Sequence, residues 1–159
     1  MSTSDTMRTI TLTGKPPVRI READWGVIAW ASFHDYDGQY DFQANRNWRG
    51  SLRVRQHGDG RAIVYATWSY ESQCQGERGY AQRAGELLVG DRLCDVTKDA
   101  PSDPSDLYDH RTRTAETFAE IIAAIKRVHA TIDPQDDAHA EQWRLLAAEC
   151  IADLPAQEI

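Results

Sequence analysis

The sequence predicts an α+β fold: an antiparallel β-sheet centred on one hairpin, with a C-terminal αα-hairpin packed on one face of the sheet. Residues 48–70 alternate apolar and polar side chains with the period of two that a β-strand requires, on both sides of a Gly58-Asp59-Gly60 turn. Residues 114–154 instead repeat apolar side chains at helical spacing, in two stretches. The 159 residues are about one domain in length, so we expect a single domain over 1–159.

The turn of the central hairpin, residues 48–57 and 61–70, determines its register. A three-residue turn that ends in Gly60 at a positive φ pairs His57 with Arg61. All apolar side chains of both strands then lie on one face, whereas a two-residue turn would shift the parity and bury the arginines. The same register predicts that the indole of Trp68 lies over Gly50, which has no side chain to collide with it.

The opposite face of this hairpin is basic, and it is the one feature with functional content. We take the following residues as the candidate binding site: Arg49, Arg53, Arg55, His57, Arg61 and Tyr65. One interpretation is an ordinary solvated face, or a face covered internally by the acidic loop 95–109. A second is nucleic-acid binding, because guanidinium groups match phosphates and a ring can stack on bases. A third is contact with an acidic protein surface, with Arg and Tyr as anchors.

The distribution of charge favours a protein partner. The net charge is −7, whereas nucleic-acid-binding domains are usually basic. Residues 1–92 hold 12 Lys/Arg against 11 Asp/Glu, and residues 93–159 hold 6 against 14. A nucleic acid would have to approach past this acidic region. We therefore expect a non-enzymatic protein that contacts an acidic surface on a host protein, with nucleic acid as the alternative partner.

Before the hairpin, the sequence predicts an edge strand and a short helix. Residues 1–7 are expected to be disordered, and residues 9–13 to form a strand that stops at Pro16-Pro17. Within 22–32, Trp25, Ile28 and Ala29 fall at helical spacing behind two acidic residues, which predicts a helix. A short strand is expected at 40–43.

After the hairpin, residues 79–90 predict one or two further strands, and residues 95–113 predict an acidic loop. A first helical stripe consists of Phe118, Ile121, Ile122, Ile125, Val128 and Ile132, with Thr114 or Thr117 as the N-cap. A second helix is expected to start at Asp133-Pro134, with a stripe of Trp143, Leu146, Ala147, Cys150 and Leu154. One core is expected to join both regions through Leu52, Val54, Val64, Trp68, Ile121, Ile125 and Leu146.

Motifs that would indicate catalysis are missing from the sequence. It has no phosphate-binding glycine loop, GxSxG or HExxH, so we expect no cofactor and no catalytic residues. A small enzyme with an acid–base site built from His34, Asp35 and Asp37 is a further alternative. No metal site is expected: the three cysteines are far apart, and a pair of His129 and His139 on the predicted helices is disfavoured.

The location expected from the sequence is the cytoplasm. The longest run without a charged residue is 25–34, about half of what spans a bilayer, and the N-terminus shows no apolar signal segment.

Several segments of the chain resemble a family of small uncharacterised proteins encoded on plasmids and integrative elements of proteobacteria. The segments are TITLTGKPPVRI (9–20), YDGQY and FQANR (36–46), RQH and DGRA (55–62), RAGELL (83–88) and CIADLP (150–155). Together they cover about a third of the chain. The resemblance implies no catalytic residues. It implies a mobile-element accessory protein or inhibitor, of the kind that binds host defence or regulatory proteins.

Overall fold

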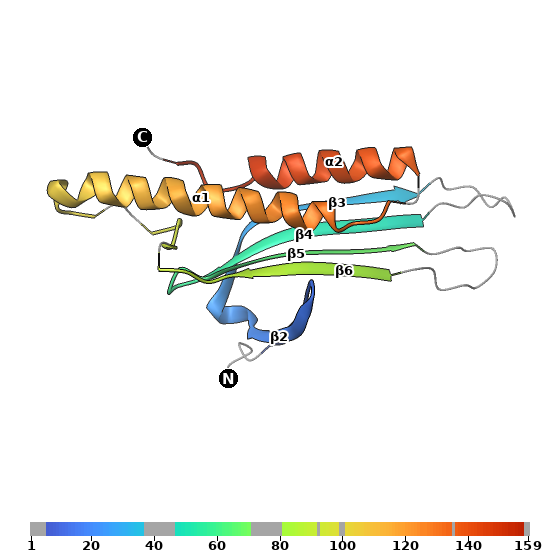
Figure 1. The fold of residues 1–159 in the computed structure, drawn as a ribbon, viewed down its shortest axis with the longest axis horizontal. Coiled ribbons are helices and arrows are strands. Elements are labelled where there is room, and N and C mark those ends of the chain that lie inside the picture. The colour runs from blue at the N-terminus through green and yellow to red at the C-terminus, as the bar shows by residue number, and fades with distance from the viewer. Residues whose placement is uncertain are drawn as a thin grey trace, which may run out of the picture.

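The computed structural model describes residues 6–36, 47–70, 81–91, 93–98, 101–134 and 136–157, and it has the predicted α+β architecture in three layers (Figure 1). A four-stranded antiparallel sheet in the order β3-β4-β5-β6 forms the middle layer. Helices α1 and α2 cover one face, and the small hairpin β1–β2 lies against the other. The elements are β1 (Met7–Leu12), β2 (Lys15–Arg21), β3 (Trp25–Tyr36), β4 (Asn47–His57), β5 (Ala62–Tyr70), β6 (Ala81–Leu88), α1 (Leu107–Ala130) and α2 (Asp137–Ala152).

The predicted register of the central hairpin, β4–β5, is confirmed. Val54 pairs with Val64, and Gly50 pairs with Trp68. The backbone N–H of His57 donates to the carbonyl of Arg61 at 2.9 Å, and Gly60 has a φ of +100°. The ring over Gly50, however, belongs to Phe33: a Cβ on Gly50 would lie 2.7 Å from it. The prediction that Trp68 occupies this place is therefore wrong.

The apolar face of the sheet and the two helices share one core, as predicted. It contains all seven expected residues, and Leu52, Ile121 and Ile125 are at most 1% exposed. Helix α1 packs on β5 and β6, and α2 packs on β3 and β4. The helices cover this face, so a binding surface on the sheet is sought on the other one.

The predicted helix over 22–32 is wrong. A 3₁₀ turn at Glu22–Asp24 is followed by the long strand β3. The register of β3 against β4 shifts between Val27 and Ala29, which marks a β-bulge. The bulge puts Trp25 on the outer face and Ala29 on the helix face. It therefore breaks the period of two and leaves apolar residues at spacings that imitate a helix.

The chain before β3 forms a hairpin rather than one strand. Strand β1 agrees with the strand predicted at 9–13, but the chain returns as β2 through Pro16 and Pro17. The residue pairs between the two strands skip both prolines, which lie where the register shifts after Ile10. Proline is tolerated at such an irregularity because no ladder hydrogen bond is lost. Residues 79–90 contribute one strand, β6, and the strand predicted at 40–43 lies outside the described residues.

Both helices begin at places other than predicted. Helix α1 starts at Leu107, so the acidic loop is shorter than 95–113, and Thr114 and Thr117 are buried inside the helix. A 3₁₀ turn capped by Asp103 leads into it. Helix α2 is capped by Asp136, whose side chain accepts from the N–H of His139 at 2.7 Å, and not by Asp133. Asp103, before α1, and Asp136, before α2, therefore cap helical turns.

Candidate functional site

The outer face of the sheet is closed at one end by the β1–β2 hairpin. A second apolar cluster forms there between the hairpin and the strands, and it consists of Ile10, Leu12, Ile20, Trp25, Ile63 and Tyr65. The hairpin is anchored at Gly85 of β6. The N–H of Thr13 donates to the Gly85 carbonyl at 2.8 Å, and a Cβ on Gly85 would lie 2.3 Å from the carbonyl oxygen of Thr11. Glycine is required here because the two backbones touch.

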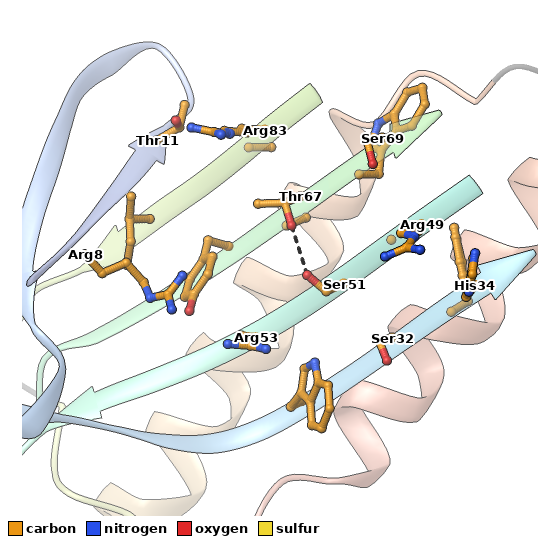
Figure 2. Close-up of a pocket in the computed structure, with 18 of the residues that line it drawn as sticks. Arg8, Thr11, Ser32, His34, Arg49, Ser51, Arg53, Thr67, Ser69 and Arg83 are labelled. Carbon is orange, nitrogen blue, oxygen red and sulfur yellow. Dashed lines mark hydrogen bonds between the residues drawn. The ribbon is translucent and has the colours of Figure 1, made fainter. Parts of the chain in front are cut away.

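At the open end of the same face lies a groove of about 570 Å³, which we call the basic groove (Figure 2). Its floor consists of β3 to β6, and β1 forms one wall. Among the described residues, the groove is lined by four arginines, one histidine and several hydroxyl groups, and by no aspartate or glutamate. The polar residues are Arg8, Arg49, Arg53, Arg83, His34, Thr9, Thr11, Ser32, Ser51, Thr67 and Ser69.

The strand register arranges the floor of the groove in rows. One row across the sheet runs Ser32, Ser51, Thr67 and Arg83, from β3 to β6. The hydroxyls of Ser51 and Thr67 are hydrogen-bonded to each other at 3.0 Å in the middle of the floor (Figure 2). Arg49 and Arg53 lie two residues to either side of Ser51 on β4. The groove therefore has a hydroxyl centre with guanidinium groups around it.

The arginines of the basic groove differ in their partners. Arg8 forms an ion pair with Glu22, and this hydrogen bond lowers the pKa of Glu22 below its usual value. The guanidinium of Arg53 lies 5.1 Å from the centre of the Trp30 ring, and its Nε is buried without a hydrogen-bond partner. Among the described residues, no carboxylate forms an ion pair with Arg49, Arg53 or Arg83.

Of the six residues selected from the sequence, Arg49, Arg53 and Tyr65 line the groove. The expectation that Arg55 and Tyr65 are exposed is wrong, because each is 6% exposed. The Nε of Arg55 donates to the Tyr65 hydroxyl at 2.9 Å, and its Nη1 donates to the Trp25 carbonyl at 3.0 Å. The β1–β2 hairpin, which covers this end of the face, is the physical reason.

The other two selected residues, His57 and Arg61, lie at the hairpin turn, outside the groove lining. Arg61 forms an ion pair with Asp59 at 2.8 Å, and Nδ1 of His57 accepts from the Asp59 N–H at 3.1 Å. The Arg61 hydrogen bonds lower the pKa of Asp59. Asp59 compensates the charge of Arg61 and occupies Nδ1 of His57, so both side chains have local partners at the turn.

Several groove residues were missed by the sequence reasoning. Arg8, Trp30 and Arg83 come from three strands outside the central hairpin. Arg83 could have been found from the sequence: if residues 81–88 are taken as a strand, alternation puts its side chain on one face with those of the other odd-numbered residues. Trp30 could not be placed because the bulge in β3 hides its alternation.

The acidic loop does not cover the basic groove, as far as its residues are described. Gln56 donates to the Cys94 carbonyl at 2.8 Å and accepts from the Val96 N–H at 3.0 Å, and the Cys94 N–H donates to Thr117 of α1. The loop therefore packs beside the hairpin turn and α1. Of the described residues after Ala84, none lines the groove. The interpretation of an internal acidic cover is wrong for this part of the chain.

The alternative enzyme site is only partly visible. His34 lines the basic groove, while Asp37 and the side chain of Asp35 lie outside the described residues. His139 is buried, and its Nε2 accepts from the Trp143 indole at 3.0 Å. Within the described ranges, no group of three His, Cys, Asp or Glu residues could hold a metal ion. Cys150 is also buried, and burial raises the pKa of its thiol to about 12.

Comparison with known proteins gives no match: no family model, no curated protein and no solved structure is similar to this chain. None of the helices in the described part of the chain is long and apolar enough to cross a membrane. The function therefore has to be argued from the groove itself.

Proposed function

We propose that this protein is a non-enzymatic binding protein whose basic groove takes an acidic segment of a partner protein. The observation that carries the proposal is the unbalanced charge of the groove: Arg49, Arg53 and Arg83 have no carboxylate partner among the described residues. Like charges in a concave site repel one another, and an anionic segment converts that repulsion into attraction. In the mobile-element setting, such a partner would be a host protein.

The rings of the groove favour an acidic polypeptide over base stacking. Single-stranded nucleic acid is held by aromatic side chains whose faces are open to the bases. Tyr65 is buried, with its hydroxyl bound to Arg55, and one face of the Trp30 ring is occupied by Arg53. What the groove offers to a ligand is guanidinium and hydroxyl donors, which suit carboxylate and phosphate oxygens.

Nucleic acid is a second candidate, and the layer arrangement favours it. Helices α1 and α2 and the described residues of the connections that carry the acidic charge do not line the groove, and the helices lie on the opposite face of the sheet (Figure 1). The acidic region therefore does not stand in front of the basic groove, and the electrostatic objection raised from the sequence loses much of its force.

The experiment compares two anionic probes against matched charge reversals. Fluorescein-labelled polyglutamate and an oligodeoxythymidylate of equal charge are titrated with the protein, and anisotropy is followed at two salt concentrations. The groove variant is Arg49→Glu with Arg53→Glu. The control variant is Arg111→Glu with Arg113→Glu, an equal charge change at exposed positions of α1.

We expect polyglutamate to bind the wild type and the control variant, and to lose at least about tenfold in affinity for the groove variant, since two charge-assisted contacts are reversed. The same groove variant should fail to recover a partner from host lysate. Equal affinity of all three proteins for polyglutamate, or no binding, contradicts the proposal. Tighter binding of the oligonucleotide, lost only in the groove variant, would put the second candidate first.

A further inference from the structure

We infer that the basic groove contains a subsite for one phosphate group, centred on the Ser51–Thr67 hydroxyl pair, and that this group belongs to a phosphorylated side chain of the partner protein. The inference rests on the proposed function, since it specifies the chemistry of the acidic segment. An acidic segment alone would not be sufficient for this subsite. The partner would also have to present a tetrahedral oxyanion at one place on the floor of the basic groove.

The arginines surround that place at nearly equal distances. Arg49 and Arg53 are four residues apart on β4, about 13 Å at strand spacing. Arg83 is two strands away from β4, in the row of Ser51 and Thr67, which puts its Cα about 12 Å from both of the others. The centre of this triangle lies over the hydroxyl pair, about 7 Å from each Cα, a length that an extended arginine side chain spans.

The hydroxyl pair leaves one proton for a ligand. Each hydroxyl has a single O–H, and the Ser51–Thr67 hydrogen bond at 3.0 Å uses one of the two. The hydroxyl that accepts this bond is free to turn its own proton into the groove, polarised by its neighbour. Both side chains are only partly buried, so the proton can reach a ligand.

Hydrogen-bond donors of the groove arginines are available to a ligand. The Nε–H of Arg53 is buried without a partner, an arrangement that costs free energy until a ligand or a change of rotamer satisfies it. In Figure 2, Arg83 extends toward Thr11, so it has to turn inward to join the other two. A dianion over the hydroxyl pair would attract all three guanidinium groups.

A phosphomonoester fits this arrangement better than a carboxylate does. Its three terminal oxygens carry a charge of about −1.5 to −2 and can accept from several guanidinium groups and a hydroxyl at once. A carboxylate has two oxygens in one plane and a single charge, so it can engage one guanidinium fork fully and leaves the other arginines uncompensated.

The test uses one acidic peptide in three forms that differ at a single position: phosphoserine, serine or glutamate. A 5′-phosphorylated oligodeoxythymidylate and inorganic phosphate complete the set of probes. Binding is followed by tryptophan fluorescence, because Trp30 is 49% exposed under Arg53 while the other four tryptophans are at most 7% exposed. The variants are Arg49→Gln, Arg53→Gln, Ser51→Ala and, as a control on α1, Arg111→Gln. Circular dichroism checks that each variant folds.

We expect the phosphoserine peptide to bind at least about tenfold more tightly than the glutamate peptide, by the difference of one strong charge-assisted contact. Arg49→Gln and Arg53→Gln should each remove that advantage. Ser51→Ala should reduce it severalfold without affecting the glutamate peptide, and Arg111→Gln should leave it unchanged. Inorganic phosphate should compete with the phosphopeptide in the wild type and in Arg111→Gln, but not in Arg49→Gln or Arg53→Gln.

Equal affinity for the phosphoserine and glutamate peptides would overturn the inference while leaving the proposed function in place. No binding of any acidic peptide would overturn both. If the 5′-phosphorylated oligonucleotide bound more tightly than the phosphopeptide, the assignment to a phosphorylated protein side chain would be wrong. An unchanged preference for phosphoserine in Ser51→Ala would contradict the placement of the subsite.

Discussion

Arg53 and Arg55 point to the same face of β4, two residues apart, and yet they meet opposite environments. Arg55 lies under the β1–β2 hairpin, 6% exposed, with hydrogen bonds to Tyr65 and Trp25. Arg53 lies in the open groove, stacked on Trp30, with a buried Nε that has no partner. What covers each end of the strand therefore decides whether an arginine holds the fold together or stays available for a ligand.

The difference has a physical cause that lies in the N-terminal chain. The β1–β2 hairpin brings three apolar side chains, Ile10, Leu12 and Ile20, onto one end of a face that is otherwise polar. Water is excluded there, so Arg55 needs internal acceptors and finds them. At the other end no described segment covers the face, and the guanidinium groups keep unused donors.

The largest expected effect tests the closed end directly. Arg55→Ala leaves the Tyr65 hydroxyl and the Trp25 carbonyl without their buried donor, so it should lower the free energy of unfolding by about 3 kcal/mol. Arg53→Ala should lower it by less than about 1 kcal/mol, because its guanidinium makes only a partly exposed contact with Trp30. Urea unfolding of both variants measures the difference. Equal losses would show that the two ends of the strand do not differ.

A smaller effect is expected where the hairpin meets β6. In Gly85→Ala the new Cβ would lie 2.3 Å from the Thr11 carbonyl oxygen, so the hairpin has to move away, at about 1 to 3 kcal/mol. Gly26→Ala is the matched control, since a Cβ there meets nothing within 4 Å. Hydrogen exchange should show loss of protection in β1 and β2 for the first variant only. Retained protection in Gly85→Ala would mean that the contact with Thr11 does not hold the hairpin.

The fold was predictable where a local rule determines it. The turn at Gly60 and the parity of Leu52 and Val54 were sufficient for the register of β4–β5, and the helical stripes identified Ile121 and Ile125 as core residues. The prediction failed for β3 because its bulge at 27–29 interrupts the alternation. It failed at the start of α1 because Asp103, in a stretch that looks like a solvated loop, caps a 3₁₀ turn that leads into the helix, and at the start of α2 because Asp136 and not Asp133 is the cap.

Alternation within β4 was enough to predict which site residues share one face of that strand, but not the rest of the site. Arg49 and Arg53 share the groove as the alternation indicated, but which arginines stay exposed depends on a hairpin 30 or more residues away in sequence. That dependence is tertiary, since nothing in residues 48–70 distinguishes Arg53 from Arg55. The contributions of Arg8 and Arg83 likewise require the packing of β1 and β6 on the central strands.

The smallest expected effect concerns Glu22. This residue forms ion pairs with Arg8 of the basic groove and with Arg55 at the closed end of the face. The hydrogen bond from Arg8 is the main reason why the pKa of Glu22 lies below its usual value of 4.5, and the charges of Arg55 and Arg53 act in the same direction. Such a carboxyl binds protons more weakly in the folded than in the unfolded protein. It therefore adds stability above its unfolded pKa and loses this contribution as the pH falls through its folded pKa.

The difference in melting temperature between the wild type and Glu22→Gln should therefore be constant from pH 7 down to about pH 5 and shrink at more acidic pH. It should be small, since both side chains are partly exposed to water. In an Arg8→Gln background the pH dependence should largely vanish, because the main cause of the shifted pKa is gone. A difference that persists unchanged to pH 3 would show that Arg8 is not held by Glu22. Arg8 would then belong wholly to the basic groove.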